Sequence, residues 1–220
     1  MPLDIVLGAQ WGDEGKGSIT DLLAENANMV VRFSGGDNAG HTVTVGDQTF
    51  KLHLIPSGII HDGTMCLIGN GVVLNPAVFL RELGGLKERG LDTSPNRLKI
   101  SRNTHLITPA HIALDTAKEA ARGDGKLGTT LRGIGPAYLD KVGRAGIRAD
   151  LLEKPEELDA AIRAHVEAHN VTLTKIYGVD PLDADSVSAE FQEHARNIAP
   201  YLADGSVMID RALNLMPGRS

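Results

Sequence analysis

Residues 8 to 18, which read GAQWGDEGKGS, carry side chains suited to phosphate chemistry. A glycine-rich turn between a strand and a helix points backbone N–H groups at an anion, and the helix N-terminus adds about half a positive charge. Lys16 supplies a full cation at the start of that helix. Asp13 would repel phosphates unless Mg²⁺ neutralised its charge, so it could serve as a metal ligand or as a base. The stretch therefore indicates a nucleotide-phosphate site of unusual design.

The spacing differs from that of the standard P-loop. That motif has four residues between its first glycine and the Gly-Lys pair, followed by Ser or Thr. Here six residues separate Gly8 from Gly15, and Gly17 stands between Lys16 and Ser18. The stretch is also consistent with an exposed acidic turn and a solvated lysine, because short glycine motifs often occur by chance. This motif alone does not decide between the two interpretations.

A second candidate loop follows the apolar run 29–33. Residues 34 to 42 read SGGDNAGHT and place Asn38 and His41 after that run, at the end of the strand where open α/β sheets bind their ligands. A histidine can donate a proton or stabilise developing negative charge near neutral pH. A lone histidine is also often structural, and Asn38 could simply occupy a left-handed turn position. Two such loops in one site would make a stronger case than either alone.

The elements expected to position these loops are short apolar runs joined by amphipathic segments. Ile19, Leu22 and Leu23 share one face at helical spacing, between the first two apolar runs. This order predicts a βαβ unit, with the glycine-rich turn between its first strand and its helix. Four runs are typical of strands in residue type and length: residues 3–7, 29–33, 49–55 and 65–69.

Later segments also alternate between runs typical of strands and of helices. Asn75, followed by proline, predicts the N-terminus of a second helix, and a third helix is expected to end at Gly123. Seven glycines between residues 123 and 146 predict an ordered functional loop region instead of a long helix. Beyond residue 155, Leu158 and Ile162 begin an apolar face that predicts a helical tail.

We therefore expect an α/β fold. A mainly parallel central sheet should carry a modified P-loop-like nucleotide site, with a helical subdomain beside it. The nucleotide-binding core is expected over residues 1–102, and the glycine-rich substrate loops and helical subdomain over residues 103–220.

Composition and charge narrow the classes of function. Of the 220 residues, 42% are hydrophobic and 23% charged, and no apolar run is long enough to span a bilayer. The formal net charge of -6 argues against a broad nucleic-acid-binding surface, although a local basic pocket for phosphate is compatible with it. A single cysteine, Cys66, excludes an intramolecular disulfide, and no secretory leader is recognisable. We expect a cytoplasmic protein with no nucleic-acid or membrane partner.

Six motifs occur together in one order and spacing: QWGDEGKG, NAGHT, HLIPSGI, IGNGVVLNP, GTTLRGIGPAY and DKVGRAG. In these residues the chain resembles the adenylosuccinate synthetase family. The resemblance runs from about Leu3 to Leu151, with weaker similarity through the helical tail. It implies a GTP-dependent ligation of IMP and aspartate to adenylosuccinate, through 6-phosphoryl-IMP, in AMP biosynthesis.

The resemblance also implies a role for particular residues. Asp13 is the expected general base for the N1 proton of IMP, and His41 the expected general acid on the GTP side. Mg²⁺ is expected to bind Asp13 and the backbone carbonyl of Gly40. The implied GTP-binding residues are Gly12, Asp13, Glu14, Gly15, Lys16, Gly17, Ser18, Gly40, His41 and Thr42. The implied IMP-binding residues are Asp13, Lys16, Asn38, Ala39, Gly40, His41, Thr130 and Arg144.

Arg144 matches an arginine that, in this family, reaches the IMP site of the neighbouring subunit, which implies a homodimer. Considered without the resemblance, Thr130 could simply cap the following turn. Arg132 and Arg144 could likewise be solvated loop cations.

The family's chains are typically about twice this long. Their later half contains an EGAQG segment that contacts IMP and the residues that recognise aspartate and guanine, and these 220 residues contain no EGAQ. One hypothesis is that the chain functions as an adenylosuccinate synthetase with that half supplied elsewhere. The alternatives are a truncated, catalytically incompetent nucleotide-binding fragment, one piece of a split enzyme, or a different phosphotransferase built on the same loop.

Overall fold

The computed structural model describes residues 3–9, 15–45 and 48–214. Its strands are β1 (Met29–Gly35), β2 (His41–Val45), β3 (Gln48–Leu52), β4 (Met65–Leu74), β5 (Leu98–Ser101), β6 (His105–Leu106) and β7 (Leu202–Ala203). The central sheet is parallel and has the order β1, β4, β5, β7, with β6 pairing near the end of β4. β2 and β3 form a separate antiparallel pair. The prediction of a mainly parallel sheet is confirmed.

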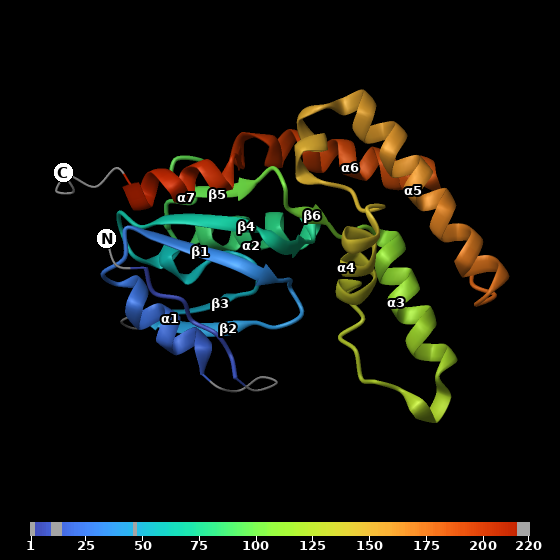
Figure 1. Ribbon diagram of the computed structural model, residues 1–220, viewed down its shortest axis with the longest axis horizontal. Coiled ribbons are helices and arrows are strands. Elements are labelled where there is room, and N and C mark those ends of the chain that lie inside the picture. Colours follow the sequence, from blue (N-terminus) through green and yellow to red (C-terminus); the bar gives the residue numbers. More distant parts are fainter. Residues whose placement is uncertain (1–2, 10–14, 46–47, 215–220) are drawn as a thin grey trace.

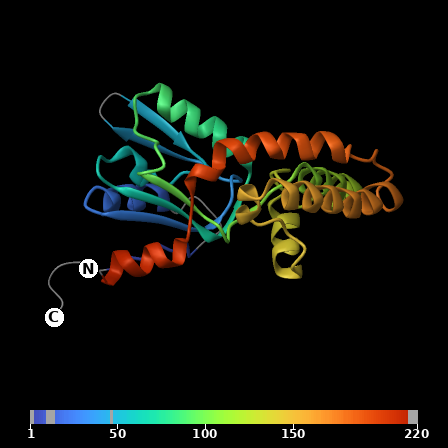
Figure 2. The same ribbon diagram turned by 90° about the horizontal axis from the view of Figure 1, so that it is seen from above.

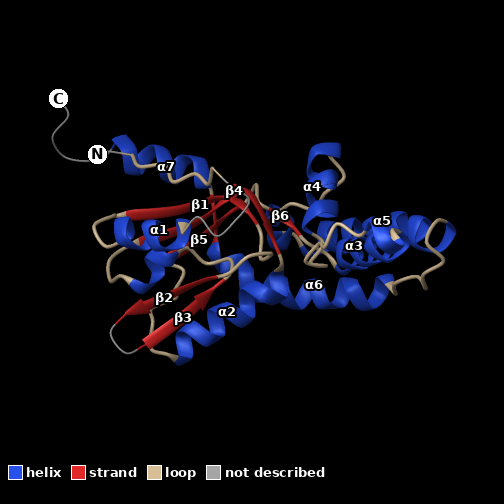
Figure 3. Cartoon of the chain, turned by 90° about the horizontal axis from the view of Figure 1, so that it is seen from below, coloured by secondary structure: helices blue, strands red, loops and turns tan. Residues whose placement is uncertain are grey.

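The helices lie on both faces of this sheet and beyond one of its ends (Figures 1, 2 and 3). They are α1 (Lys16–Ala24), α2 (Pro76–Glu88), α3 (Pro109–Ala121), α4 (Ile134–Gly143), α5 (Pro155–Lys175), α6 (Ala184–Ile198) and α7 (Gly205–Asn214). α7 lies on one face of the sheet, and α2 lies with β2 and β3 on the other (Figures 2 and 3). α3, α4 and α5 lie together beyond one end of the sheet (Figure 1). None of the helices in the described ranges combines the length and apolar character needed to cross a bilayer.

β4 is the central strand of the sheet and is buried along most of its length. Both of its faces are covered, as expected for a strand inside a parallel sheet. The pairing of β1 with β4 shifts register between Arg32 and Ser34. A Cβ atom at Gly71 would overlap the carbonyl oxygen of Phe33, so only glycine permits the close approach at this irregularity.

The first predicted strand is not formed. Residues 3–9 have no regular secondary structure, and Leu3, Ile5 and Leu7 are 62%, 66% and 70% exposed. A strand needs a neighbour for its hydrogen bonds and at least one buried face, and residues 3–7 have neither among the described residues. Of the predicted βαβ unit, the structure contains the helix α1 and the second strand β1.

The glycine-rich segment beyond Gly123, predicted as an ordered loop region instead of a long helix, also contains the ten-residue helix α4, which was not predicted. Gly133 adopts a left-handed conformation at the helix N-cap. Ile134, Ala137 and Tyr138 follow at spacings of three and four and pack into a small buried cluster. A helical glycine costs about 1 kcal/mol relative to alanine, which this packing outweighs.

The other helix predictions are confirmed. The side chain of Asn75 caps α2 by accepting a hydrogen bond from the N–H of Val78 at 3.2 Å, and proline follows it. α3 ends at Ala121, close to the predicted stop. The predicted tail forms α5, α6 and α7, and Leu158 and Ile162 are fully buried on α5.

Glu82 on α2 holds the segment that follows β3. Its carboxylate oxygens accept hydrogen bonds from the backbone N–H groups of His53, Leu54 and Ile55, at 2.9 to 3.1 Å. Burial raises the pKa of Glu82, and the three N–H groups oppose that rise. The carboxylate therefore accepts hydrogen bonds from three backbone N–H groups, as the carbonyl oxygens of a neighbouring strand would.

Replacing Glu82 with alanine should lower the free energy of unfolding by about 3 kcal/mol, because three buried N–H groups lose their acceptor. Denaturant unfolding followed by circular dichroism measures the change. Glu88→Ala, at the exposed end of the same helix, is the matched control and should stay within about 0.5 kcal/mol of the parent chain. Equal stability of the two variants would contradict this account of Glu82.

Candidate functional site

The N-terminus of α1 lies at the predicted phosphate-binding turn. Gly15 is its N-cap residue and adopts a left-handed conformation, with φ 80° and ψ 17°, which glycine reaches without strain. Lys16, Gly17 and Ser18 form the first turn, and the N-terminus of a helix favours an anion. The predicted site residues Gly12, Asp13 and Glu14 lie outside the described residues.

The second predicted loop lies against this first turn. β2 begins at His41, and a Cβ atom built on Gly17 would lie only 2.8 Å from the Cβ of His41. The structure therefore brings together two segments that are separated by the whole of β1. Thr42 follows on β2, and Asn38, Ala39 and Gly40 precede it as exposed residues.

Buried polar contacts fix the beginning of this second loop. The guanidinium of Arg32 donates hydrogen bonds to the carbonyl oxygens of His53 and Gly36. The hydroxyl of Tyr138 accepts a hydrogen bond from the N–H of Gly35 at 2.8 Å and donates to the carbonyl of Gly71 at 2.8 Å. These contacts hold the loop at its base while leaving its tip open to solvent.

His41 is partly buried, and its electrostatics favour the neutral ring. Its Nε2 atom is buried and has no hydrogen-bond partner among the described residues. Burial lowers the pKa of the imidazole, Arg32 lowers it further, and Asp21 opposes the shift. A neutral imidazole still donates one N–H, which can reach a phosphate oxygen. An unpaired buried nitrogen is unfavourable, so Nε2 has hydrogen-bonding capacity that the described residues leave unused.

Of the two residues predicted to bind magnesium, Gly40 lies among the described residues. Gly40 is exposed directly beside His41, with its Cα against the ring of His53. A main-chain carbonyl and a carboxylate are the hard oxygen donors that Mg²⁺ prefers. Gly40 can supply the first, and the second would come from Asp13.

The predicted residues on the later loops occupy two different places. Thr130 is exposed in the loop before α4, and Arg144 is exposed at the C-cap of that helix. The loop of Thr130 is joined to the second loop, since Arg132 Nη1 donates to the carbonyl of Asp37 at 2.6 Å. The contacts among the described residues do not bring Arg144 to either phosphate-side loop.

Sequence reasoning missed several residues that shape the site. Arg32 is a charge inside the apolar run of β1, a local sign of a buried polar role. Asp115 on α3 accepts hydrogen bonds from Thr129 Oγ1 at 3.1 Å and from the N–H of Gly133 at 3.0 Å, and so shapes the loop that carries Thr130. Nothing in the sequence pattern alone singles out Asp115, because its partners lie on another segment.

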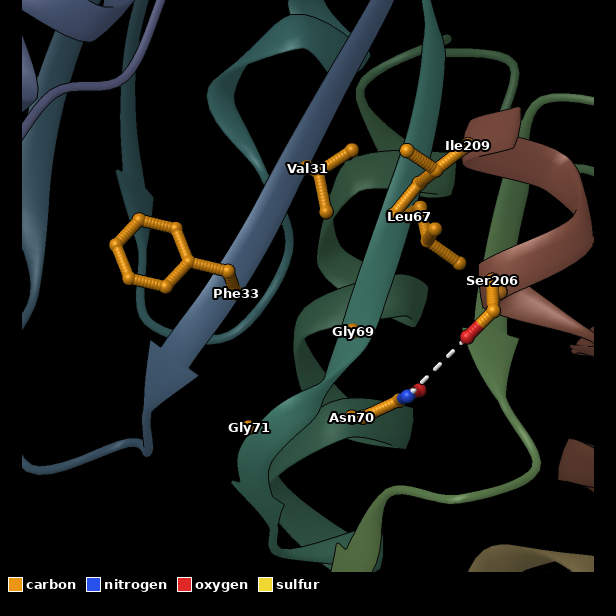
Figure 4. Close-up of a pocket in the computed structure, with 9 residues that line it drawn as sticks. Val31, Phe33, Leu67, Gly69, Asn70, Gly71, Ser206 and Ile209 are labelled. Atoms are coloured by element: carbon orange, nitrogen blue, oxygen red, sulfur yellow. Dashed lines mark hydrogen bonds between the residues drawn. The ribbon is translucent and has the colours of Figure 1, made fainter. Parts of the chain in front are cut away.

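A separate pocket of about 210 Å³ lies between β1, β4 and α7. Figure 4 shows Val31, Leu67 and Ile209 on its wall, with Asn70 Nδ2 3.5 Å from Ser206 Oγ. None of its lining residues is titratable. Its lining residues therefore offer no titratable side chain for proton transfer, and the pocket does not include the predicted site residues.

The sequence model of a family described as adenylosuccinate synthetase matches residues 5–216. The chain belongs to the adenylosuccinate synthetase family. The match includes both loops that meet at Gly17 and His41, together with the helices beyond them.

Individual members of the family agree with this assignment. Adenylosuccinate synthetase from Nitratidesulfovibrio vulgaris (strain DP4) is 56% identical over 209 residues, covering 94% of this chain and 49% of the relative. The synthetase from Moorella thermoacetica is 53% identical over 213 residues, covering 97% and 49%. The chain thus spans about half the length of the curated relatives it matches.

A solved structure confirms the predicted fold class. The fully ligated adenylosuccinate synthetase from Plasmodium falciparum superposes with a TM-score of 0.83 at 32% identity. The superposition covers 94% of this chain and 48% of that one.

Two glycine-to-alanine changes test the contact between the loops. Gly17→Ala places a methyl group against His41, so it should destabilise the chain by about 1–3 kcal/mol and move the His41 imidazole signals in NMR spectra. Gly84→Ala, where the added Cβ meets nothing within 4 Å, is the matched control on α2 and should stabilise by up to about 1 kcal/mol. Equal effects of the two changes would show that Gly17 and His41 are not in contact.

The titration of His41 provides a pH test. In the folded chain its pKa should lie below 6.5, because burial and Arg32 disfavour the charged ring. The unfolded chain then binds the proton first, so the stability contributed by His41 is complete above pH 6.5 and is lost as the pH falls from there through the folded pKa. NMR titration of the imidazole measures the midpoint, with the urea-unfolded chain as reference. A higher midpoint in the folded chain would refute this electrostatic description.

Proposed function

We propose that this chain provides the phosphoryl-transfer part of an adenylosuccinate synthetase, which ligates IMP and aspartate at the expense of GTP in AMP biosynthesis. The observation that supports it most is the contact of the α1 N-terminus with His41 in a chain that belongs to this family. The contact joins an anion-binding turn to a proton-bearing side chain. Both are needed for a phosphoryl transfer.

The reaction proceeds in two steps. Asp13 removes the N1 proton of IMP, and the 6-oxygen attacks the γ-phosphorus of GTP while GDP leaves. The amino group of aspartate then attacks C6 of 6-phosphoryl-IMP, and inorganic phosphate leaves. His41 donates its N–H to the GTP phosphates, which carry more charge as the β–γ bridge breaks.

The remaining residues bind the two nucleotides. Gly12, Asp13, Glu14, Gly15, Lys16, Gly17 and Ser18 lie around the GTP phosphates, together with Gly40, His41 and Thr42. Asn38 and Thr130 bind the phosphate and ribose side of IMP. Asp13, Lys16, Ala39, Gly40 and His41 are the other IMP-binding residues of this subunit. A magnesium ion held by Asp13 and Gly40 supplies charge neutralisation at the phosphates.

Arg144 completes the IMP site of a neighbouring subunit in a homodimer. Its exposure at the end of α4 supports this role, since a side chain that acts in a partner must point away from its own core. The free thiol of Cys66 is buried, which is compatible with the reducing cytoplasm in which we place the protein.

Nucleotide binding without turnover is a second candidate function. The specific observation in its favour is that the chain spans about half the length of its curated relatives. On this alternative the described loops bind GTP, whereas recognition of aspartate and guanine requires residues from the part of the relatives that this chain does not cover.

A complementation assay distinguishes the two functions and tests Asp13. The chain is mixed with GTP, IMP, aspartate and Mg²⁺, alone or with the part of the Nitratidesulfovibrio vulgaris synthetase that lies beyond the matched region, and adenylosuccinate is quantified chromatographically. We expect little product from the chain alone and clear turnover with the complement. In the complemented mixture, Asp13→Ala should lower turnover by about 10²–10⁴-fold, because the general base is lost.

Asp180→Ala, at an exposed position outside the helices, is the matched control and should keep full turnover. Robust product from the chain alone would refute the dependence on further residues. Unchanged turnover in Asp13→Ala would refute the general-base assignment.

A further inference from the structure

Four metal-ligating side chains that the proposed function does not use converge where α3, α4 and α5 meet. They are His111 on α3, Asp140 on α4, and His165 and His169 on α5, and one ligand atom from each lies within 4.8 Å of the others. Asp140 Oδ2 is the centre of the group. It lies 3.1 Å from His111 Nε2, 3.7 Å from His165 Nδ1 and 3.2 Å from His169 Nε2.

The second ring nitrogens of the two α5 histidines are already engaged. His169 Nδ1 donates to the carbonyl oxygen of His165 at 3.0 Å, which leaves Nε2 as the nitrogen with a lone pair. His165 Nε2 lies 3.0 Å from Thr108 Oγ1, which lets Nδ1 carry the lone pair. Histidines that bind metals usually make such a bond through their other nitrogen, because it fixes the tautomer and the ring orientation.

His111 has the opposite arrangement. Its Nδ1 accepts a hydrogen bond from the backbone N–H of Thr108 at 3.0 Å, so the ring proton of the neutral form is on Nε2. That proton is donated to Asp140 Oδ2. His111 is therefore suited to orienting the carboxylate and unsuited to binding a metal through Nε2.

From this geometry, we propose that His165 Nδ1, His169 Nε2 and a carboxylate oxygen of Asp140 bind a divalent transition-metal ion of the zinc class, with His111 orienting Asp140. Two histidines at i and i+4 present their rings on one helix face, as in known helical zinc motifs. Zinc bonds of 2.0–2.2 Å in a tetrahedron place ligand atoms about 3.3 Å apart. The two distances from Asp140 Oδ2, 3.2 and 3.7 Å, are close to that spacing.

The surroundings fit an ion that enters from solvent and is then held. The side chain of His165 is 3% exposed, that of His169 is 12% exposed and that of Asp140 is 18% exposed. A lone pair on His169 Nε2 facing a carboxylate oxygen at 3.2 Å needs a positive charge between them. A metal ion supplies that charge. The alternative is a second ring proton, bound to His169 Nε2.

Metal binding would join the helices that support the second loop. α4 carries Tyr138, whose hydroxyl is hydrogen-bonded to the backbone of Gly35 and Gly71. Asp140, the proposed metal ligand on α4, lies two residues after Tyr138. A metal that bridges α4 and α5 therefore stabilises the folded chain and restrains the helix behind the loop.

Cobalt is a suitable probe because Co²⁺ bound by nitrogen and oxygen ligands in a tetrahedral site has strong visible absorption bands. The untagged chain is titrated with Co²⁺ in buffer free of phosphate and nucleotide, with excess Mg²⁺ present to occupy sites made of oxygen ligands. We expect one Co²⁺ per chain, displacement of the bands by Zn²⁺, and a higher melting temperature with Zn²⁺. His169→Gln should weaken Co²⁺ binding at least tenfold.

His194→Gln is the matched control, since His194 pairs with Glu190 at the same i, i+4 spacing on α6 and belongs to no cluster of three metal-ligating side chains among the described residues. It should leave Co²⁺ binding unchanged. Absence of the bands at one equivalent, or unchanged affinity in folded His169→Gln, would overturn the proposal and leave the ring proton as the occupant. If His169→Gln does not fold, NMR of the parent chain decides: Zn²⁺ must shift the imidazole signals of His165 and His169 but not those of His194, and any other pattern overturns the site.

Discussion

The candidate site depends on one close approach, that of the first turn of α1 to His41. With no side chain at Gly17, the helix N-terminus and the start of β2 lie in direct contact. β2 in turn pairs with β3, and the segment after β3 is held by Glu82 of α2. The predicted phosphate-binding turn is thereby connected through short contacts to the buried core of the molecule.

Buried charges give the loops their shape, in a way that apolar packing cannot. Arg32 and Glu82 have most of their hydrogen-bonding capacity directed at main-chain groups. Burial disfavours the charged form of each side chain, which lowers the pKa of Arg32 and raises the pKa of Glu82. Their main-chain partners offset part of that penalty, and the two side chains specify where the segments around residues 36 and 53 must lie.

Where the determinants of structure are local, the sequence predicts it well. Asn75 with the proline after it defined the start of α2, and the apolar spacing from Leu158 defined α5. The strand expected at residues 3–7 failed because a strand depends on a neighbour and a cover that its own residues do not specify. α4 was not predicted because its glycines argue against a helix. Its apolar residues form a recognisable face only in contact with other segments.

The site itself was predictable only in part. The sequence pattern allowed the loops at Gly17 and His41 to share one site, because both follow apolar runs typical of strands, although the first of these runs forms no strand. It could not indicate Asp115 or Glu82, since their partners are distant in the chain. The histidine cluster is a similar case, because His165 and His169 become a candidate metal site only beside Asp140 of another helix.

The claim that the two loops form one nucleotide site is tested most directly by titrating the chain with GTP in the presence of Mg²⁺ while recording NMR spectra. The amide signal of Gly17 and the imidazole signals of His41 should shift together and give the same dissociation constant, while the signals of His194 stay unchanged. A response of only one of the two residues, or two different dissociation constants, would contradict the account.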